Sequence, residues 1–241
     1  MIKKMIDMHC HILPGVDDGA QTRKDVQTLL QMEYDDGVRT LVLTPHYRKE
    51  MFEPDKRLVK QRFEYIKKEI AQMGLDMEVF LGCEYHANAD MIKDLKLNPH
   101  FRINGSLYVL VEFSGLHAYR SIREWIYQLI ISGFRPIVAH VERYPEVMKD
   151  IKRVKELIDM GAYMQVSSSA VTGEDGLITK LQVKGLLKKG LVHFVGSDAH
   201  NATDRAPNMK KCAEYIAKKI DYAYAKNIFV NNPRKILGYK D

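Results

Sequence analysis

The sequence contains few cysteines and no long apolar run. Its three cysteines, Cys10, Cys83 and Cys212, do not have the spacing of a disulfide framework. A small and odd number of cysteines is typical of proteins in a reducing compartment, so we expect a cytoplasmic protein. No apolar run approaches the roughly 18–20 residues that span a membrane, and the N-terminal MIKKMIDMHCH lacks the apolar segment of a signal peptide. We therefore expect no membrane insertion.

Strong charge is also missing. The formal net charge of +6 is compatible with phosphorylated or acidic partners but does not establish them. No motif combines basic residues with stacking aromatics, so we expect no nucleic-acid partner. With 46% hydrophobic and 28% charged residues among 241, the composition is that of an ordinary soluble domain with an ample core.

One pattern recurs along the chain: an amphipathic helix ends in glycine, and a short apolar strand follows. A glycine in this place is typical of a left-handed helix C-terminus. Continuous apolar runs are typical of parallel strands that are buried on both faces. The glycines are Gly37, Gly74, Gly133, Gly161 and Gly190, and the runs include TLVLT, EVFLG, LYVLVEF, PIVAH, YMQVS and HFVGS.

The spacing of these strands predicts the fold class. Their ends fall near residues 9, 44, 84, 112, 140, 167 and 197, at intervals typical of βα units. Seven such units predict an α/β fold with a parallel barrel, one unit short of the usual eight. Without any linker or repeat array, we expect a single domain over residues 1–241.

Helical periodicity supports the α part of this prediction. Apolar residues recur at helical spacing over 122–130, and again over 147–158 with Pro145 near the first turn. We therefore expect one continuous helix in the second region. Thr22 and Asp25 have the spacing of a capping box at the start of the first long helix.

Two histidines flank a cysteine at the end of the first strand. Because strand side chains alternate, His9 and His11 should share one face and Cys10 should lie on the other. One such pair is a weak signal by itself, since a polar strand end gives the same pattern.

The other strand ends strengthen the metal hypothesis. Every predicted strand except the sixth ends at, or just before, a metal-capable side chain, and in a barrel these ends meet on one face. Burying so many ionisable groups without a metal would be very costly. The candidates are His9, His11, one of Asp17 and Asp18, His46, Glu84, Glu112, His140, Asp198 and His200.

The donor set predicts the kind of metal centre. Mixed nitrogen and oxygen ligands suit Mn²⁺, Fe or Zn²⁺. Nine ligands are too many for one ion, and a carboxylate such as Glu84 can bridge. We therefore expect a cluster of two or three ions, of the kind that supports phosphoryl displacement.

Two arginines follow these strand ends. Arg143 lies three residues after His140, and Arg205 lies five residues after His200. A loop arginine alone is commonly a surface ion pair, but beside a metal cluster its fork suits phosphate oxygens. We predict that both arginines bind phosphate.

With these residues assembled, the sequence resembles the PHP (polymerase and histidinol phosphatase) superfamily. Within it, the chain is similar to the bacterial metal-dependent protein-tyrosine phosphatases of the CpsB/CapC type. The resemblance implies a distorted (β/α)7 TIM-like barrel and a trinuclear site that often contains manganese. The matching stretches are DMHCHILPGVDDGA, LTPH, GCE, VEF, AHVERYP and GSDAHN, which span residues 7–201.

The resemblance also implies residue roles. It assigns His9, His11, Glu84 and Asp198 to one metal, Glu84, Glu112 and His140 to a second, and Asp18, His46 and His200 to a third. Asp18 is preferred to Asp17 because the family motif has its ligand at the second aspartate. Arg143 and Arg205 match the family's phosphate-binding arginines. The implied substrate is phosphotyrosine on the tail of a bacterial tyrosine kinase that regulates capsule or exopolysaccharide synthesis.

The expected reaction is direct hydrolysis, in which a metal-bridging hydroxide attacks phosphorus. A cysteine-dependent tyrosine phosphatase needs Cys-x5-Arg. No cysteine here has that arginine, since the sixth residues after the three cysteines are Val16, Ala89 and Lys218. This leaves the metal-dependent route.

Several alternatives stay open. The enzyme could act on a small phosphate ester such as histidinol phosphate, or on a phosphodiester, and a catalytically inactive scaffold is the alternative of another class. His86 is a candidate rim residue or neighbour of a ligand, and the segment 47–57 is a candidate mobile loop over the site. We interpret His100, His117 and His193 as structural or surface residues.

Overall fold

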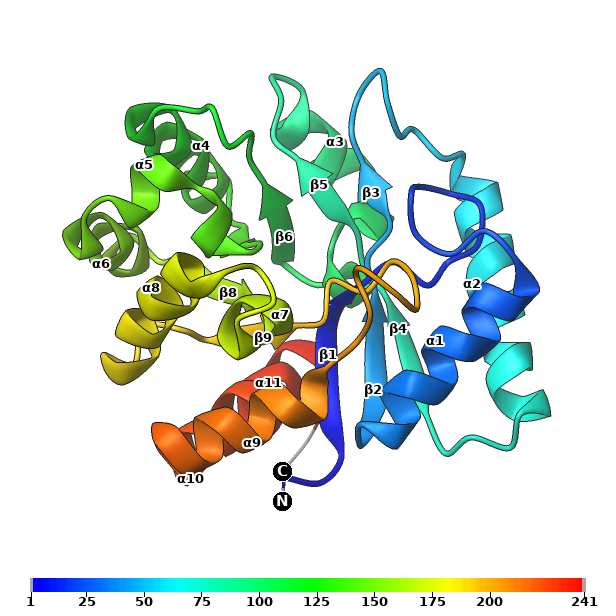
Figure 1. The fold of residues 1–241 in the computed structure, drawn as a ribbon. Helices are drawn as coiled ribbons and strands as arrows, with labels where there is room; N and C mark the ends of the chain where they lie inside the picture. Colours follow the sequence, from blue (N-terminus) through cyan, green and yellow to red (C-terminus); the bar gives the residue numbers. More distant parts are fainter. Residues whose placement is uncertain (1, 240–241) are drawn as a thin grey trace.

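The computed structural model describes residues 2–239, which form a parallel sheet curled into a barrel with helices around it (Figure 1). The strands are β1 (Met5–Cys10), β2 (Val38–Leu43), β3 (His46–Tyr47), β4 (Glu78–Leu81), β5 (Glu84–His86), β6 (Tyr108–Glu112), β7 (Arg135–Val138), β8 (Tyr163–Ser167) and β9 (Phe194–Gly196). The longer helices are α1 (Arg23–Asp35), α2 (Lys56–Gln72), α3 (Met91–Leu97), α4 (Tyr119–Ile131), α6 (Ile151–Asp159), α8 (Leu177–Lys188) and α9 (Met209–Lys219).

The strands form two sheet segments that together make the predicted barrel. The orders are β1-β2-β4 and β3-β5-β6-β7-β8-β9, and every strand pair in them is parallel. β3 continues the path of β2, and β5 that of β4, so the nine labelled strands occupy seven barrel positions. Backbone bonds between His9 and Asp198, and between His11 and Ala199, join β9 to β1. The (β/α)7 prediction is confirmed.

A small apolar core fills the barrel below the polar strand ends. Side chains from the strands meet there with Ile103 from η2 (Ile103–Gly105) and with Ile236 and Leu237 from α11 (Asn232–Leu237). A larger apolar core lies between the sheet and the outer helices. The barrel is therefore a packed scaffold whose carboxyl ends alone are polar, which is how this architecture presents functional groups.

Most of the predicted helix boundaries are confirmed. Thr22 and Asp25 form a reciprocal capping box at α1. All five predicted glycines have positive φ angles at the ends of helices. No helix within residues 2–239 combines the length and apolarity that crossing a membrane requires.

One predicted helix is wrong in its continuity. The periodic segment after Pro145 divides into α5 (Pro145–Met148) and α6. Asp150 has an extended backbone there, and its side chain accepts a hydrogen bond from the Lys152 amide, so it caps α6. Apolar periodicity continues across the break because both pieces pack on the same core, which hides the interruption from a sequence pattern.

Candidate metal centre

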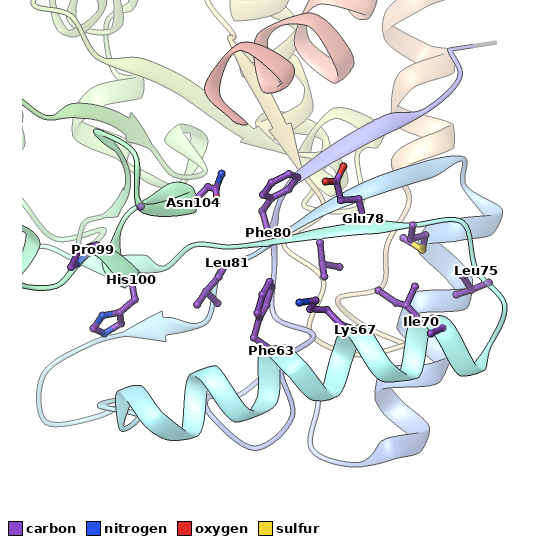
Figure 2. A pocket seen from close by; sticks show the side chains of 14 residues that line it. Phe63, Lys67, Ile70, Leu75, Glu78, Phe80, Leu81, Pro99, His100 and Asn104 are labelled. Atoms are coloured by element: carbon purple, nitrogen blue, oxygen red, sulfur yellow. The ribbon is translucent and has the colours of Figure 1, made fainter. Parts of the chain in front are cut away.

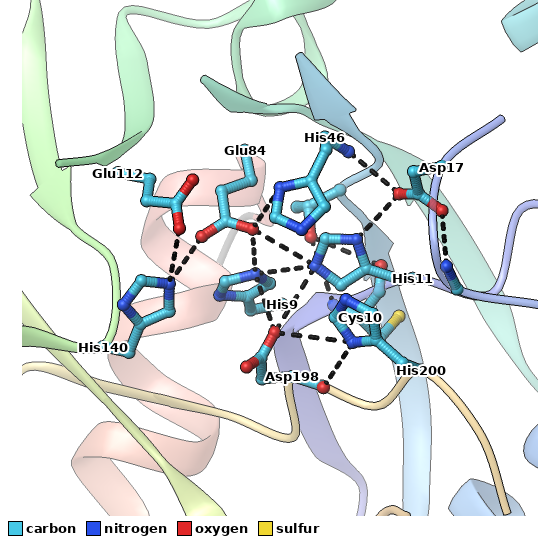
Figure 3. A network of polar contacts seen from close by, with 12 residues as sticks. His9, Cys10, His11, Asp17, His46, Glu84, Glu112, His140, Asp198 and His200 are labelled. Atoms are coloured by element: carbon cyan, nitrogen blue, oxygen red, sulfur yellow. Dashed lines mark hydrogen bonds and ion pairs between the residues drawn. The ribbon is translucent and has the colours of Figure 1, made fainter. Parts of the chain in front are cut away.

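The nine predicted ligands converge at the carboxyl ends of the strands, as Figure 3 shows for eight of them. Three groups have potential ligand atoms that all lie within 4.8 Å of one another. The groups are His9, His11, Glu84 and Asp198; His11, Asp18, His46 and His200; and His46, Glu84 and Glu112. His140 joins the third group through Glu84, because its Nε2 lies 2.7 Å from Glu84 Oε1.

This grouping differs in two details from the sets that the resemblance implies. His11 Nε2 stands between two of the groups, and His46 lies close to Glu84 as well as to Asp18. His140 Nε2 is 3.8 Å from Glu112 Oε1, which keeps these two side chains adjacent. The groups therefore overlap in one polynuclear arrangement in which Glu84 is the central carboxylate.

A break in the register of β1 directs His9, and His11 just after the strand, into the site. Ile6 and Met8 face the inner core, so strict alternation would direct His9 outward. The pairing of β1 with β2 is irregular between Asp7 and Cys10, and this irregularity reverses the alternation. The Cys10 thiol points to the Val42 carbonyl and lies in the outer core. The prediction that Cys10 faces away from the histidines is confirmed.

Two other site residues depend on unusual backbone angles. Ile137 and Ala139 face the inner core, so His140 would point outward in a regular strand. Its φ of 29° and ψ of 61° turn it into the site instead. Asp198 also has a positive φ, 53°. Residues of this type in this region carry strain, and such strain concentrates at functional sites.

Four imidazoles are oriented by a partner at Nδ1. When Nδ1 carries the proton, it donates to that partner and leaves the Nε2 lone pair facing the cluster, as a metal ligand requires. The pairs are His9 with Gln165 Oε1 (3.5 Å), His11 with Asp17 Oδ2 (2.8 Å), His140 with the Tyr144 hydroxyl (3.3 Å) and His200 with the Asp198 carbonyl (2.8 Å).

The structure separates the roles of the two neighbouring aspartates. Asp17 is buried, and its carboxylate accepts hydrogen bonds from the His11 ring and from the backbone amides of His46 and Gly19. Asp18 is more exposed, and its Oδ1 lies 3.4 Å from His200 Nε2 and 3.5 Å from His46 Nε2. Asp18 therefore has the position of a ligand, and Asp17 that of a residue orienting other ligands.

The electrostatics favour carboxylates that stay ionised inside the site. Burial alone would raise the pKa of Glu84, but the surrounding imidazoles hold it well below its ordinary value. Burial is likewise overcome at Asp198, where His9, His11 and the Arg143 guanidinium lower the pKa. Burial lowers the pKa of His46 to about 4, which favours its neutral form.

Asp198 connects the predicted phosphate-binding arginines to this cluster. Its Oδ2 accepts hydrogen bonds from Arg143 (2.6 Å) and Arg205 (2.8 Å). Its Oδ1 lies 3.4 Å from Nε2 of both His9 and His11. Both arginine side chains are more than one-third exposed, at 39% and 35%. Their remaining N–H groups can therefore reach a ligand at the mouth of the barrel.

The residues fit a cluster of divalent ions. Asp198 Oδ1 and His200 Nε2 are buried and have no hydrogen-bond partner among the described residues. The Nε2 atoms of His9 and His11 lie 3.0 Å apart, although the Nδ1 partners favour a lone pair on both. Four carboxylates and five imidazoles with lone pairs directed inward form a set that cations satisfy.

Sequence reasoning missed the residues that orient these groups. Gln165 belongs to no metal-binding motif. Its Oε1 nevertheless lies 3.5 Å from Nδ1 of His9 and accepts a hydrogen bond from the backbone amide of His140. Asp7 was overlooked too, although its buried carboxylate accepts hydrogen bonds from the backbone and side chain of Ser197. Their signal in the sequence is a polar residue inside an otherwise apolar strand.

The remaining histidines lie outside the ligand groups. His86 is half-buried at the rim, where it pairs in register with Glu112. His193 Nδ1 accepts a hydrogen bond from the Met164 amide, which is the structural role expected for it. His100 lines a cavity of about 800 Å³ between α2 and β4 (Figure 2). None of the candidate ligands lines that cavity, so it is separate from the candidate metal centre.

The fold and the site together define a class: a metal-dependent hydrolase built on a TIM-like barrel. A comparison with solved structures supports this assignment. A structure described as that of "YwqE from Bacillus subtilis and CpsB from Streptococcus pneumoniae, unique metal-dependent tyrosine phosphatases" matches with a TM-score of 0.90 and 27% identity. The match covers 98% of this chain and 96% of that one.

The chain belongs to the CpsB/CapC family of capsular polysaccharide synthesis, whose model matches residues 5–238. It is 38% identical to the tyrosine-protein phosphatase CpsB of Streptococcus pneumoniae over 238 residues, which cover 97% of this chain and 98% of that relative. It is 31% identical to the tyrosine-protein phosphatase YwqE of Bacillus subtilis over 215 residues, covering 89% of this chain and 84% of the relative.

Proposed function

We propose that this chain is a metal-dependent protein-tyrosine phosphatase. The observation that carries the proposal is the convergence of nine candidate nitrogen and oxygen ligands beside two arginines that share one carboxylate oxygen. Membership of a family whose relatives are tyrosine-protein phosphatases supports the choice of substrate.

We assign His9, His11, Asp18, His46, Glu84, Glu112, His140, Asp198 and His200 as metal ligands, and residues 1–241 as the single domain that carries them. Two or three ions, preferably Mn²⁺, would be held there and would supply an activated water and positive charge for phosphoryl transfer. Imidazole and carboxylate ligands also suit Fe and Zn²⁺.

The protein's own groups bind and orient the phosphate. Arg143 and Arg205 present N–H forks that match phosphoryl oxygens, and Asp198 holds both forks at the mouth of the site. Asp17 and Gln165 keep the ligand rings in place without touching the substrate. The phenol that forms from the departing group has a pKa of about 10, so a phenolate needs less protonation than an alkoxide does.

The proposed biological substrate is a phosphotyrosine-bearing protein of capsule or exopolysaccharide synthesis, such as the tail of a bacterial tyrosine kinase. The family to which the chain belongs supports this choice. A small-molecule phosphatase is less well supported, and an inactive scaffold would be expected to have lost ligands, whereas all nine are present.

A substrate panel with defined metals tests the proposal. The metal-loaded protein should hydrolyse a phosphotyrosine peptide much faster than histidinol phosphate or a single-stranded oligonucleotide. Preferential hydrolysis of histidinol phosphate would establish the small-molecule alternative. No hydrolysis of any of them by a protein with its full metal content would favour the scaffold.

A further inference from the structure

A second row of side chains lies one step closer to the mouth than the central ligands. His46 pairs with Glu84 across β3 and β5, and His86 pairs with Glu112 across β5 and β6. Side chains two residues apart in a strand share a face. Arg48 and His86 therefore lie on the same face as His46 and Glu84, in the row that ends at Glu112.

The segment after β3 fixes the orientation of Arg48. Arg48 and Phe52 form an antiparallel bridge with two backbone hydrogen bonds of 2.8 Å, so their side chains share a face. The Phe52 ring stacks on the His46 ring, with centroids 5.5 Å apart and planes inclined by 13°. Phe52 therefore lies over the metal centre, and Arg48 lies beside it on the same side.

The basic groups of this row have no acidic partner within the described residues. Arg48 and His86 are both half-buried and form no ion pair there, and the His86 ring has the Ala87 backbone as a hydrogen-bond partner.

These groups and the two arginines proposed to bind phosphate come from different strands. Arg143 follows β7 and Arg205 follows β9, whereas the row belongs to β3, β5 and β6. Glu112, which ends the row, is directed toward His140 (Figure 3). The mouth therefore carries basic groups from β3 and β5 in addition to the arginines that follow β7 and β9, and those two arginines suffice for the phosphate that is cleaved.

We propose that Arg48 and His86 form a second anion-binding subsite, which takes an anionic group close to the phosphotyrosine in the substrate chain. The inference rests on the proposed phosphatase function. A guanidinium fork and imidazole N–H groups suit both a carboxylate side chain and a second phosphate. The subsite would make the enzyme select phosphotyrosines in acidic or multiply phosphorylated segments.

Matched phosphotyrosine peptides test the subsite in the metal-loaded protein. The peptides are identical except for flanking residues, which are glutamate, glutamine, lysine or a second phosphotyrosine. We expect kcat/KM to be about tenfold higher for the glutamate peptide than for the glutamine peptide, the size expected of one charge-assisted hydrogen bond. The doubly phosphorylated peptide shows whether phosphate is preferred to carboxylate.

Two substitutions of Arg48 complete the test. Arg48→Ala should bring the glutamate-to-glutamine ratio to about one, and Arg48→Glu should shift the preference to the lysine peptide. Lys189→Ala, which removes one exposed positive charge beyond the end of α8, should keep the wild-type ratio. Circular dichroism and metal content confirm that each variant is folded and loaded.

The outcomes separate this inference from the function on which it rests. Equal rates on all peptides in the wild type, or an unchanged ratio in Arg48→Ala, contradict the subsite and leave the phosphatase intact. If Arg48→Ala lowers kcat/KM equally for every peptide and keeps the glutamate-to-glutamine ratio, Arg48 acts on the cleaved phosphate. That result also contradicts the subsite. If no peptide is hydrolysed, the function fails, and the ratio of dissociation constants measured by anisotropy decides the subsite alone.

Discussion

Asp17 is a buried carboxylate that orients predicted metal ligands from two strands. It accepts hydrogen bonds from the His11 ring at 2.8 Å and from the His46 backbone at 2.9 Å, so it positions two predicted ligands from different strands. Such orienting carboxylates fix the ring tautomer and raise the basicity of the ligand.

We predict that Asp17→Asn weakens metal binding by roughly 10- to 100-fold, because an amide orients the His11 ring less well. Titration of the stripped protein with Mn²⁺ measures the change, and excess metal should restore part of the activity. Asp35→Asn makes the same chemical change on the exposed face of α1 and should have no effect. Unchanged metal affinity in Asp17→Asn contradicts the assigned role.

Cys10 provides a second test at the scale of one residue. Its side chain is fully buried, and burial raises the pKa of the thiol well above its ordinary value. A thiol in this state is a poor nucleophile. We predict that Cys10→Ser keeps kcat/KM, per metal-loaded molecule, within about threefold of the wild-type value. The reason is that the proposed reaction does not use the thiol as its nucleophile. Abolished activity in a folded, fully loaded Cys10→Ser protein contradicts this.

At the scale of elements, the strand pattern predicted where the chemistry lies, and the backbone determined how it is presented. Apolar runs that stop at ionisable residues predicted that Glu84, Glu112 and Asp198 would meet at one end of the barrel. Alternation alone fails at His9 and His140, because a register break and a left-handed backbone turn them inward. No residue pattern in a single sequence signals such departures.

The same limit explains the elements that were missed. The break between α5 and α6 is set by the Asp150 cap, while apolar periodicity continues through it. Asp17 and Gln165 were not recognised as orienting residues because their partners come from distant strands, and only the folded chain brings them together. Arg48 belongs to no metal-binding motif, and only the register of β3 with β5 indicates that it lies in the second row of side chains, nearer the mouth of the barrel.

The packing of β9 against β1 leads to a prediction at this scale. A methyl group at Gly196 would overlap the His9 side chain and the Gln165 amide. We predict that Gly196→Ala displaces both and lowers the metal content of the purified protein, measured by elemental analysis. Gly185→Ala is the matched control, since nothing lies within 4 Å of the added carbon there. Normal metal content in Gly196→Ala contradicts this account of the β1–β9 contact.

The whole molecule combines a packed lower barrel with a polar upper face whose charges need cations. Ile103, Ile236 and Leu237 help to fill the lower barrel, while Glu84 and Asp198 lie buried above. Since burial penalises carboxylates that lack a cation, metal binding and folding stability should be linked.

We predict that removing the metal lowers the unfolding temperature. Ions at a hundred times their dissociation constant stabilise a folded protein by about 2.7 kcal/mol, which corresponds to roughly 5–10 °C for a chain of this size. Calorimetry of stripped and Mn²⁺-loaded protein measures the shift, and Asp198→Asn should reduce it. Identical unfolding temperatures with and without metal contradict the linkage.

Hydrolysis of a phosphotyrosine peptide during metal titration tests the central claim most directly. The stripped protein should be inactive, and activity should rise with added Mn²⁺ until two or three ions are bound per chain. Saturation at that stoichiometry, with an unaffected Cys10→Ser variant, is the result that the structure predicts. Phosphotyrosine hydrolysis that survives complete removal of metal and disappears in Cys10→Ser would contradict the account.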